Sequence, residues 1–231
     1  MSKPVVTVAG EVGSGATELA QELARLLGAN FVDRQVMATA AARLGVSVQM
    51  VEDKDRTKLP RGERFARLLE TFLERSAVGD PTLGTSGVEV LMSRSYDEAL
   101  AASQHPSLTN AKYLEVLRSV MADLAREGNV IILRRGGQVL LRGLPGVLHI
   151  NVVAPYEDRL LRHMQFEGLD RAAAQKDLRD TGRDRLGYFR KFFKVNPEST
   201  EWYHLVINSH MLPPITGAQL VARAFADGIV F

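Results

Sequence analysis

Gly10-Glu11-Val12-Gly13-Ser14-Gly15-Ala16-Thr17, taken with the residues on either side, indicates the architecture of the whole chain. The β-branched, apolar run at 4–9 comes before it and predicts a buried strand. Leucines at helical spacing follow it as far as Gly28, which predicts a helix that ends there. A strand, a glycine-rich turn and a helix in this order are the context in which a phosphate-binding loop (P-loop) forms.

The residue types in this turn fit a P-loop at every key position except one. Glycines let several backbone N–H groups converge on one anion, and the helix N-terminus adds positive partial charge. The motif ends in a Ser or Thr that binds Mg²⁺, which makes Thr17 the expected metal ligand, but its lysine position holds Ala16. We expect the phosphates of ATP to contact the loop residues Gly10, Gly13, Ser14, Gly15, Ala16 and Thr17. The alternative is a glycine-rich turn without a ligand.

Composition limits the class of protein. With 231 residues, 45% of them hydrophobic and 24% charged, the chain fits one soluble globular domain, residues 1–231. A net charge of +2 does not by itself call for nucleic acid. The absence of cysteine excludes disulfides and thiolate metal sites. Without a signal-peptide core, or an apolar run near the ~18 residues of a membrane span, we expect a cytoplasmic protein with no membrane partner.

Strand-like and helix-like segments alternate along the rest of the chain. This alternation predicts an α/β fold of the P-loop NTPase type, with a mostly parallel sheet and helices on both faces. Glycine and proline interrupt residues 78–110, and we treat 34–110 as a candidate acceptor-binding insertion. The further strands are expected at 29–33, 129–133, 147–153 and 203–208, and the helices at 34–44, 63–77, 110–127, 156–167, 170–193 and 216–226, the last capped by Thr216.

Charged side chains follow the ends of these strands. Ligands of parallel sheets bind beyond the carboxyl ends of the strands, where Asp33 and Arg34 follow one strand and Arg134 and Arg135 another. We expect these four residues to bind substrate, with Arg135 also acting in catalysis. The alternative for the two later arginines is a plain surface turn.

A basic tract at 170–194 is the candidate lid. Its arginines and lysines are interleaved with aspartates, a pattern that a solvated helix with i,i+3 and i,i+4 ion pairs also shows. A P-loop without its lysine needs positive charge from elsewhere, because electrostatics dominate phosphoryl transfer. We therefore expect Arg183 and Arg185 to close over the phosphates as catalytic residues.

Five segments in this order resemble the cytidylate kinase-like family, P-loop proteins similar to nucleoside monophosphate kinases. The resemblance runs from about Val5 to Phe225 and is weakest over 54–110. The segments are Gly13-Ser14-Gly15 with Glu18-Leu19-Ala20, Leu27-Gly28 with Phe31-Val32-Asp33, Val130-Ile131-Ile132 with Arg135-Gly136, Arg183 and Arg185 with Tyr188, and Tyr203 to Asn208.

The resemblance implies roles for several of these residues. Residues 10–17 would hold the phosphates of ATP, Asp33 would lie near the acceptor nucleotide or the magnesium, and Arg135 would contact phosphate. Arg183 and Arg185 would belong to the lid. Family members commonly lack the loop lysine. The chain departs from the family pattern at Arg134, where glycine is usual, at Thr17, where arginine is frequent, and at Gly182, where an acidic residue is usual.

The leading hypothesis is an ATP- and Mg²⁺-dependent kinase that phosphorylates a nucleoside monophosphate, CMP first. One alternative is a nucleotide-binding regulatory protein without turnover, motivated by Ala16 and Arg134. Another is a kinase of a non-nucleotide metabolite, for which Asp33 is the candidate base. Nucleic acid is the weakest candidate partner, because the aromatic residues between 188 and 193 fit the buried side of a helix. The sequence leaves the oligomeric state open, and a homo-oligomer is one option.

Overall fold

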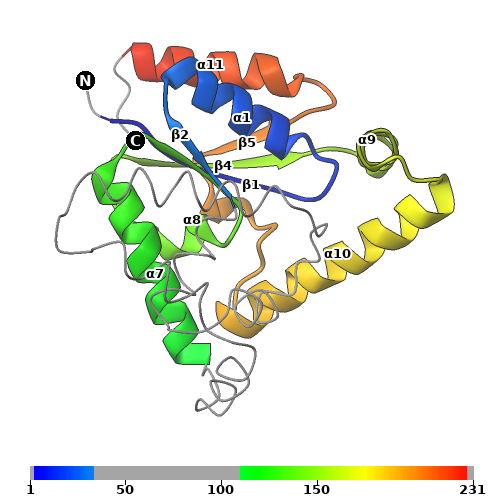
Figure 1. Cartoon of the computed structure of the whole chain (residues 1–231), viewed down its shortest axis with the longest axis horizontal. Coiled ribbons are helices and arrows are strands. Elements are labelled where there is room, and N and C mark those ends of the chain that lie inside the picture. Colours follow the sequence, from blue (N-terminus) through cyan, green and yellow to red (C-terminus); the bar gives the residue numbers. More distant parts are fainter. Residues whose placement is uncertain (1–2, 34–109, 228–231) are drawn as a thin grey trace, which may run out of the picture.

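A five-stranded, fully parallel sheet forms the centre of the molecule (Figure 1). The structure is a computed structural model, and it describes residues 3–33 and 110–227. The strand order is β2-β3-β1-β4-β5, so the first strand lies in the middle, between β3 and β4. The strands span Val5–Gly10 (β1), Asn30–Val32 (β2), Val130–Leu133 (β3), Val147–Val153 (β4) and Leu205–Asn208 (β5).

Helices cover both faces of this sheet (Figure 1). On one face α1 and α11 pack side by side, and on the other lie α7, α8 and the C-terminal part of α10. The helices span Ala16–Leu27 (α1), Asn110–Glu127 (α7), Gly137–Leu140 (α8), Tyr156–Glu167 (α9), Arg171–Phe192 (α10) and Pro214–Ala226 (α11), and a 3₁₀ helix spans Thr200–Trp202.

Alternation along the strands divides the core into two layers. In β1, Val6 and Val8 pack towards α1 and α11, whereas Val5 packs towards α7 and α10. Because successive side chains of a strand point to opposite faces, a strand that is buried on both sides reads as a continuous apolar run. This explains why β1, β3 and β4 could be predicted from the sequence as uninterrupted apolar segments.

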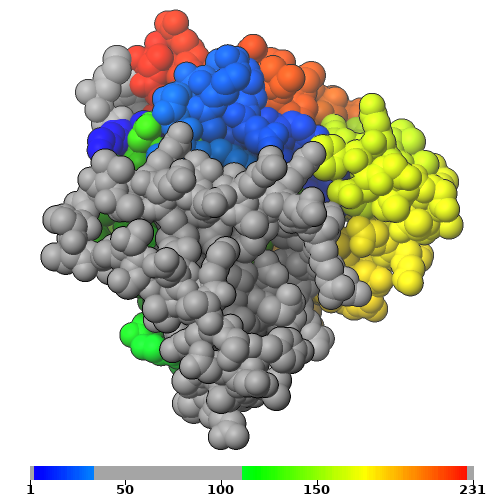
Figure 2. Space-filling view, viewed as in Figure 1, coloured from blue at the N-terminus to red at the C-terminus, as the bar shows by residue number. Residues whose placement is uncertain are grey.

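The candidate lid, residues 170–194, extends away from the sheet, and its C-terminal end packs back against the core. Helices α9 and α10 project from one side of the molecule (Figure 1), and together they form the yellow part of its surface in Figure 2. Asp170 caps α10 through a hydrogen bond that its side chain accepts from the Ala173 amide at 2.8 Å. At the other end, Tyr188, Phe189 and Phe192 are buried against α7, which confirms that the aromatic residues lie on the inner side of this helix.

The observed elements confirm the α/β prediction and correct it at two points. Thr216 does not cap the last helix, which begins earlier, at Pro214, with Pro213 as its N-cap residue. Proline suits the first helical position because its missing N–H has no partner there in any case. The short helix α8 was not predicted, since four residues after a glycine carry no periodic signal. The predicted helices at 34–44 and 63–77 lie outside the described residues.

None of the helices within residues 3–33 and 110–227 combines the length and the apolar character that a bilayer span requires.

Candidate active site

The turn between β1 and α1 has the backbone of a phosphate-binding loop. Gly13 and Gly15 adopt left-handed conformations with φ of 76° and 87°, which favour glycine over other residues. At Gly10 a side chain would collide with the loop itself, because an added Cβ would lie 2.5 Å from Ser14 Oγ and 2.7 Å from the Ala16 Cβ. The left-handed glycines and the close contacts at Gly10 together allow the loop to curl around the N-terminus of α1. Backbone N–H groups there have no helical partner.

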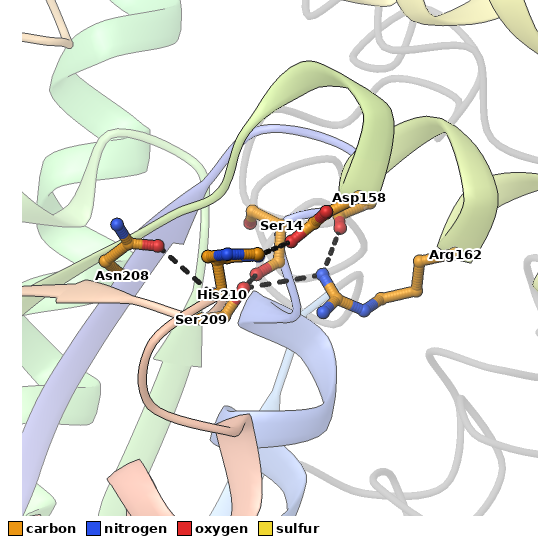
Figure 3. A network of polar contacts seen from close by, with 7 residues as sticks. Ser14, Asp158, Arg162, Asn208, Ser209 and His210 are labelled. Carbon is orange, nitrogen blue, oxygen red and sulfur yellow. Dashed lines mark hydrogen bonds and ion pairs between the residues drawn. The ribbon is translucent and has the colours of Figure 1, made fainter.

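A network from β5 and α9 holds this loop in place (Figure 3). The Ser209 hydroxyl, just after β5, donates to the Ser14 carbonyl at 2.7 Å. Arg162 of α9 points into the same place and donates to the Gly13 carbonyl and to Ser209 Oγ. Beside them, His210 Nδ1 and Asp158 Oδ2 lie within hydrogen-bond distance, 2.6 Å apart. The loop is therefore fixed by side chains far from it in the sequence.

A second feature of the site is the turn after β3. Arg134, Arg135 and Gly136 have consecutive left-handed φ values of 67°, 61° and 74°. Two neighbouring arginines in this conformation are unusual, and such strain clusters at functional sites. The turn places Arg134 Nη2 at 3.4 Å from Thr17 Oγ1, and Arg135 Nε at 4.0 Å from Asp33 Oδ1. The turn thus brings Arg134 to the P-loop and Arg135 to Asp33 at the end of β2.

One cavity of about 90 Å³ joins the loop, this turn and the candidate lid. Residues from four parts of the chain meet in it, and they are Gly10 and Glu11 of the loop, Arg134 and Arg135 of the turn, Arg159 of α9, and Arg185, Tyr188 and Phe189 of α10. Arg185 is one of its partly buried cations, with 15% of its side chain exposed. It lies 3.7 Å from Glu198 Oε1.

Arg183 lies apart from this group. Its side chain is 77% exposed and pairs with Asp180 one turn earlier on α10. It lines a neighbouring surface pocket with Arg179 and Arg190, and it does not line the P-loop cavity, although the two share Arg159, Leu178 and Gly182. The structure thus brings together Arg135 and Arg185 but leaves Arg183 outside. Arg34, the remaining substrate-binding candidate, lies outside the described residues.

Two arginines of α9 were missed by the sequence reasoning. Besides Arg162, Arg159 reaches the loop, where it pairs with Glu11 at 2.9 Å, and its backbone carbonyl lies 2.2 Å from the place that a Gly13 Cβ would take. The signal for both was available, since they are one turn apart at the start of the helix that follows a buried strand. In a parallel sheet that position is next to the ligand site.

A neutral hydrogen-bonded chain begins at Gln138, which lines the cavity. The buried Gln138 side chain donates to the Tyr203 hydroxyl at 3.1 Å, and that hydroxyl donates to the Pro197 carbonyl at 2.6 Å. Burial raises the pKa of Tyr203, and the nearby Arg185 opposes that shift. The phenol therefore stays protonated at neutral pH, and it links the segment before β5 to the turn after β3 without adding a negative charge.

The side chains at the loop fit a phosphate ligand better than a metal bound by protein alone. Ser14 Oγ is buried and has no hydrogen-bond partner within the described residues, as expected of a hydroxyl that serves a ligand. In the described part of the chain, no three His, Cys, Asp or Glu residues come together as a metal site.

Comparison with protein families adds the deciding observation. The model of the cytidylate kinase-like family matches residues 5–211, which include the loop, the Arg134–Arg135 turn and the candidate lid. The chain belongs to the cytidylate kinase-like family. Membership confirms the resemblance read from the five sequence segments.

A solved structure shows a similar fold. This member of the cytidylate kinase-like family aligns with a protein from Eubacterium ventriosum at a TM-score of 0.60 and 11% identity, over 96% of this chain and 97% of that one. It also aligns with the shikimate kinase from Acinetobacter baumannii in complex with shikimate, at a TM-score of 0.46 and 13% identity, over 98% and 94% of the two chains.

One curated protein matches part of the sequence. The uronate isomerase of Corynebacterium glutamicum is 29% identical over 162 residues, which are 69% of this chain and 30% of that protein. This cytidylate kinase-like chain therefore spans less than a third of the length of the curated relative.

Proposed function

We propose that this protein transfers the γ-phosphoryl group of ATP to a nucleoside monophosphate, with CMP as the first candidate acceptor. The observation that carries the proposal is the shared cavity of the P-loop, Arg134, Arg135 and Arg185. Phosphoryl transfer needs little covalent chemistry from the protein, and it is catalysed by positioning and by positive charge. Backbone amides and arginines at the carboxyl ends of parallel strands supply both.

The donor side of the site would consist of the loop. The amides of residues 10–17 and the buried Ser14 hydroxyl would hold the phosphates of ATP, and Thr17 would hold Mg²⁺. A magnesium ion held there would neutralise part of the charge on the phosphates. Arg162 would keep the loop in the shape that binds phosphate, because its guanidinium fixes the Gly13 carbonyl away from the ligand side.

Two arginines with little exposed surface would act on the transferred group. Arg135 and Arg185 are 5% and 15% exposed, and both line the cavity, so their charge acts in a medium that screens it weakly. Movement of α10 towards the loop would bring Arg185 over the phosphates and would exclude water. A lid of this kind limits the transfer of the phosphoryl group to water.

The acceptor would bind on the β2 side, at Asp33, Arg34 and Arg135. A phosphate acceptor is already anionic, so it needs cations to position it and no general base to activate it. Arg135 serves this purpose next to the loop, and its position 4.0 Å from Asp33 connects the two sites.

A coupled ADP-release assay with ATP and Mg²⁺ tests the proposal against CMP, dCMP, UMP, AMP and GMP. We expect turnover with at least one nucleoside monophosphate, and loss of it in Arg135→Ala. If ATP binds but no acceptor of the panel is phosphorylated, the nucleotide-acceptor proposal is wrong. In that case a regulatory protein that binds nucleotide without turnover becomes the better account, for which Ala16 is the motivating residue.

A kinase of a small hydroxy acid is the second candidate. The partial match to a uronate isomerase favours sugar acids, and a hydroxyl acceptor benefits from a carboxylate base, a role that Asp33 could take beside Arg135. Turnover with a uronate or a related sugar acid, abolished in Asp33→Asn, would support this candidate. Turnover with CMP that Asp33→Asn leaves in place would exclude it.

A further inference from the structure

We propose that Arg134 supplies to the donor phosphates the positive charge that a lysine of the loop supplies in other P-loops. The inference rests on the proposed function, because it assumes that the loop binds a nucleotide. In a complete P-loop motif the lysine reaches the β- and γ-phosphates. Here that position is Ala16, which is buried and carries no charge.

The contact between Arg134 and Thr17 places the positive charge of the Arg134 guanidinium next to the P-loop. Arg134 comes from the end of β3, which pairs directly with β1, so its side chain needs to cross only one strand spacing to reach the loop. Its Nη2 atom donates to Thr17 Oγ1 at 3.4 Å, one residue after the position of the missing lysine. A guanidinium in this place faces the region that the terminal phosphates of a nucleotide occupy in a P-loop.

The backbone of Arg134 gives independent support. Its φ of 67° is one that glycine adopts freely and that other residues adopt at a cost. A glycine would therefore suit the turn better, and the arginine gains nothing for the fold through its backbone. The gain lies in the side chain, which is half-buried and lines the same cavity as the loop.

The partners of the other arginines single out Arg134. Arg159 and Arg185 pair with carboxylates of Glu11 and Glu198, and Arg162 is engaged with the Gly13 carbonyl. Arg135 lies near the Asp33 carboxylate. Among residues 3–33 and 110–227, no carboxylate pairs with Arg134, whose contact is a neutral hydroxyl. Its charge is therefore the one in this cavity that acidic groups of the described chain leave uncompensated.

The test compares nucleotide affinity with stability in four variants of the full chain. Arg134→Gly removes the charge and suits the backbone, Arg134→Lys keeps the charge, and Ala16→Lys combined with Arg134→Gly moves the charge to the lysine position of the motif. Arg126→Ala is the matched control, because Arg126 is 76% exposed and lies before β3, at the opposite end of the sheet. Calorimetric titration with ATP and with AMP gives the affinities, and thermal unfolding without ligand gives the stability.

We expect Arg134→Gly to weaken ATP binding by at least about tenfold, the effect of losing one hydrogen bond to a charged group. AMP binding should change less, because AMP lacks the β- and γ-phosphates. The melting temperature should not fall, since glycine relieves the backbone. Ala16→Lys with Arg134→Gly should recover ATP binding, Arg134→Lys should retain more of it than Arg134→Gly, and Arg126→Ala should match the wild type.

Two results would overturn the inference. Wild-type affinity for ATP in Arg134→Gly would show that the charge is not used. Equal losses of ATP and AMP binding together with a lower melting temperature would show a structural role instead. If the double variant does not fold, the comparison of Arg134→Lys with Arg134→Gly decides the matter. A wild-type protein that binds no ATP at all would instead contradict the proposed function.

Discussion

At the scale of single residues, the two arginines predicted to act from the lid differ in their surroundings. Arg185 is 15% exposed and lines the P-loop cavity, whereas Arg183 is 77% exposed and pairs with Asp180. We predict that Arg185→Ala lowers kcat by on the order of 10³, as for arginines that contact the transferred phosphoryl group. Arg183→Ala should cost much less. Steady-state kinetics of both variants measures this difference. Equal losses of kcat would show that both arginines stabilise the transition state, and would contradict the prediction.

Another prediction at this scale concerns pH. His149 is buried in β4, where its Nδ1 lies 2.7 Å from the Thr7 hydroxyl. Burial and the stacked His204 ring lower the pKa of His149 from 6.5 to about 4. Between these two pH values the unfolded chain binds a proton that the folded protein does not. The free energy of unfolding should therefore fall as the pH drops from 6.5 to 4, by up to about 3 kcal/mol.

Urea denaturation across this pH range measures the effect, with His149→Gln as the control. The variant should lack this part of the pH dependence, because its amide does not titrate. The same slope in the wild type and in His149→Gln would show that other groups cause it.

At the scale of elements, the anchoring of the candidate lid depends on aromatic packing. Phe192 is 8% exposed and packs against Tyr113 of α7 with the ring centres 5.1 Å apart. Phe192→Ala should lower the free energy of unfolding by about 3 kcal/mol or more, as expected for a buried phenylalanine. Phe166→Ala on α9 is the matched control, because Phe166 is 76% exposed and should cost little. Similar losses in the two variants would contradict the anchoring described here.

The sequence predicted elements well where periodicity is strong and long. The buried strands and the helices α1, α7, α9 and α10 follow from apolar runs and helical spacing. The predicted start of α11 was wrong, because Thr216 offered a plausible cap two residues beyond the proline that begins the helix. Contacts such as Arg162 with the Gly13 carbonyl, or Arg134 with Thr17, join residues more than a hundred positions apart. They depend on strand order, which a single sequence does not give.

At the scale of the whole molecule, the proposal requires α10 to approach the loop when both substrates bind. We predict that an ATP analogue, Mg²⁺ and CMP together slow amide exchange in α10 and in the turn after β3. Helix α11, which packs on the α1 side of the sheet, should change little (Figure 1). Hydrogen exchange read by mass spectrometry measures both regions at once. Unchanged exchange in α10 would contradict its role as a lid.

The central claim is that residues 10–17 and the arginines around them bind the phosphates of a nucleotide. Calorimetric titration of the intact chain with ATP and Mg²⁺, alongside adenosine, tests this claim most directly. Because the site offers contacts to phosphate through the loop and the cavity arginines, ATP should bind at least about tenfold more tightly than adenosine. Equal affinity for the two ligands, or no binding of ATP, would contradict the account.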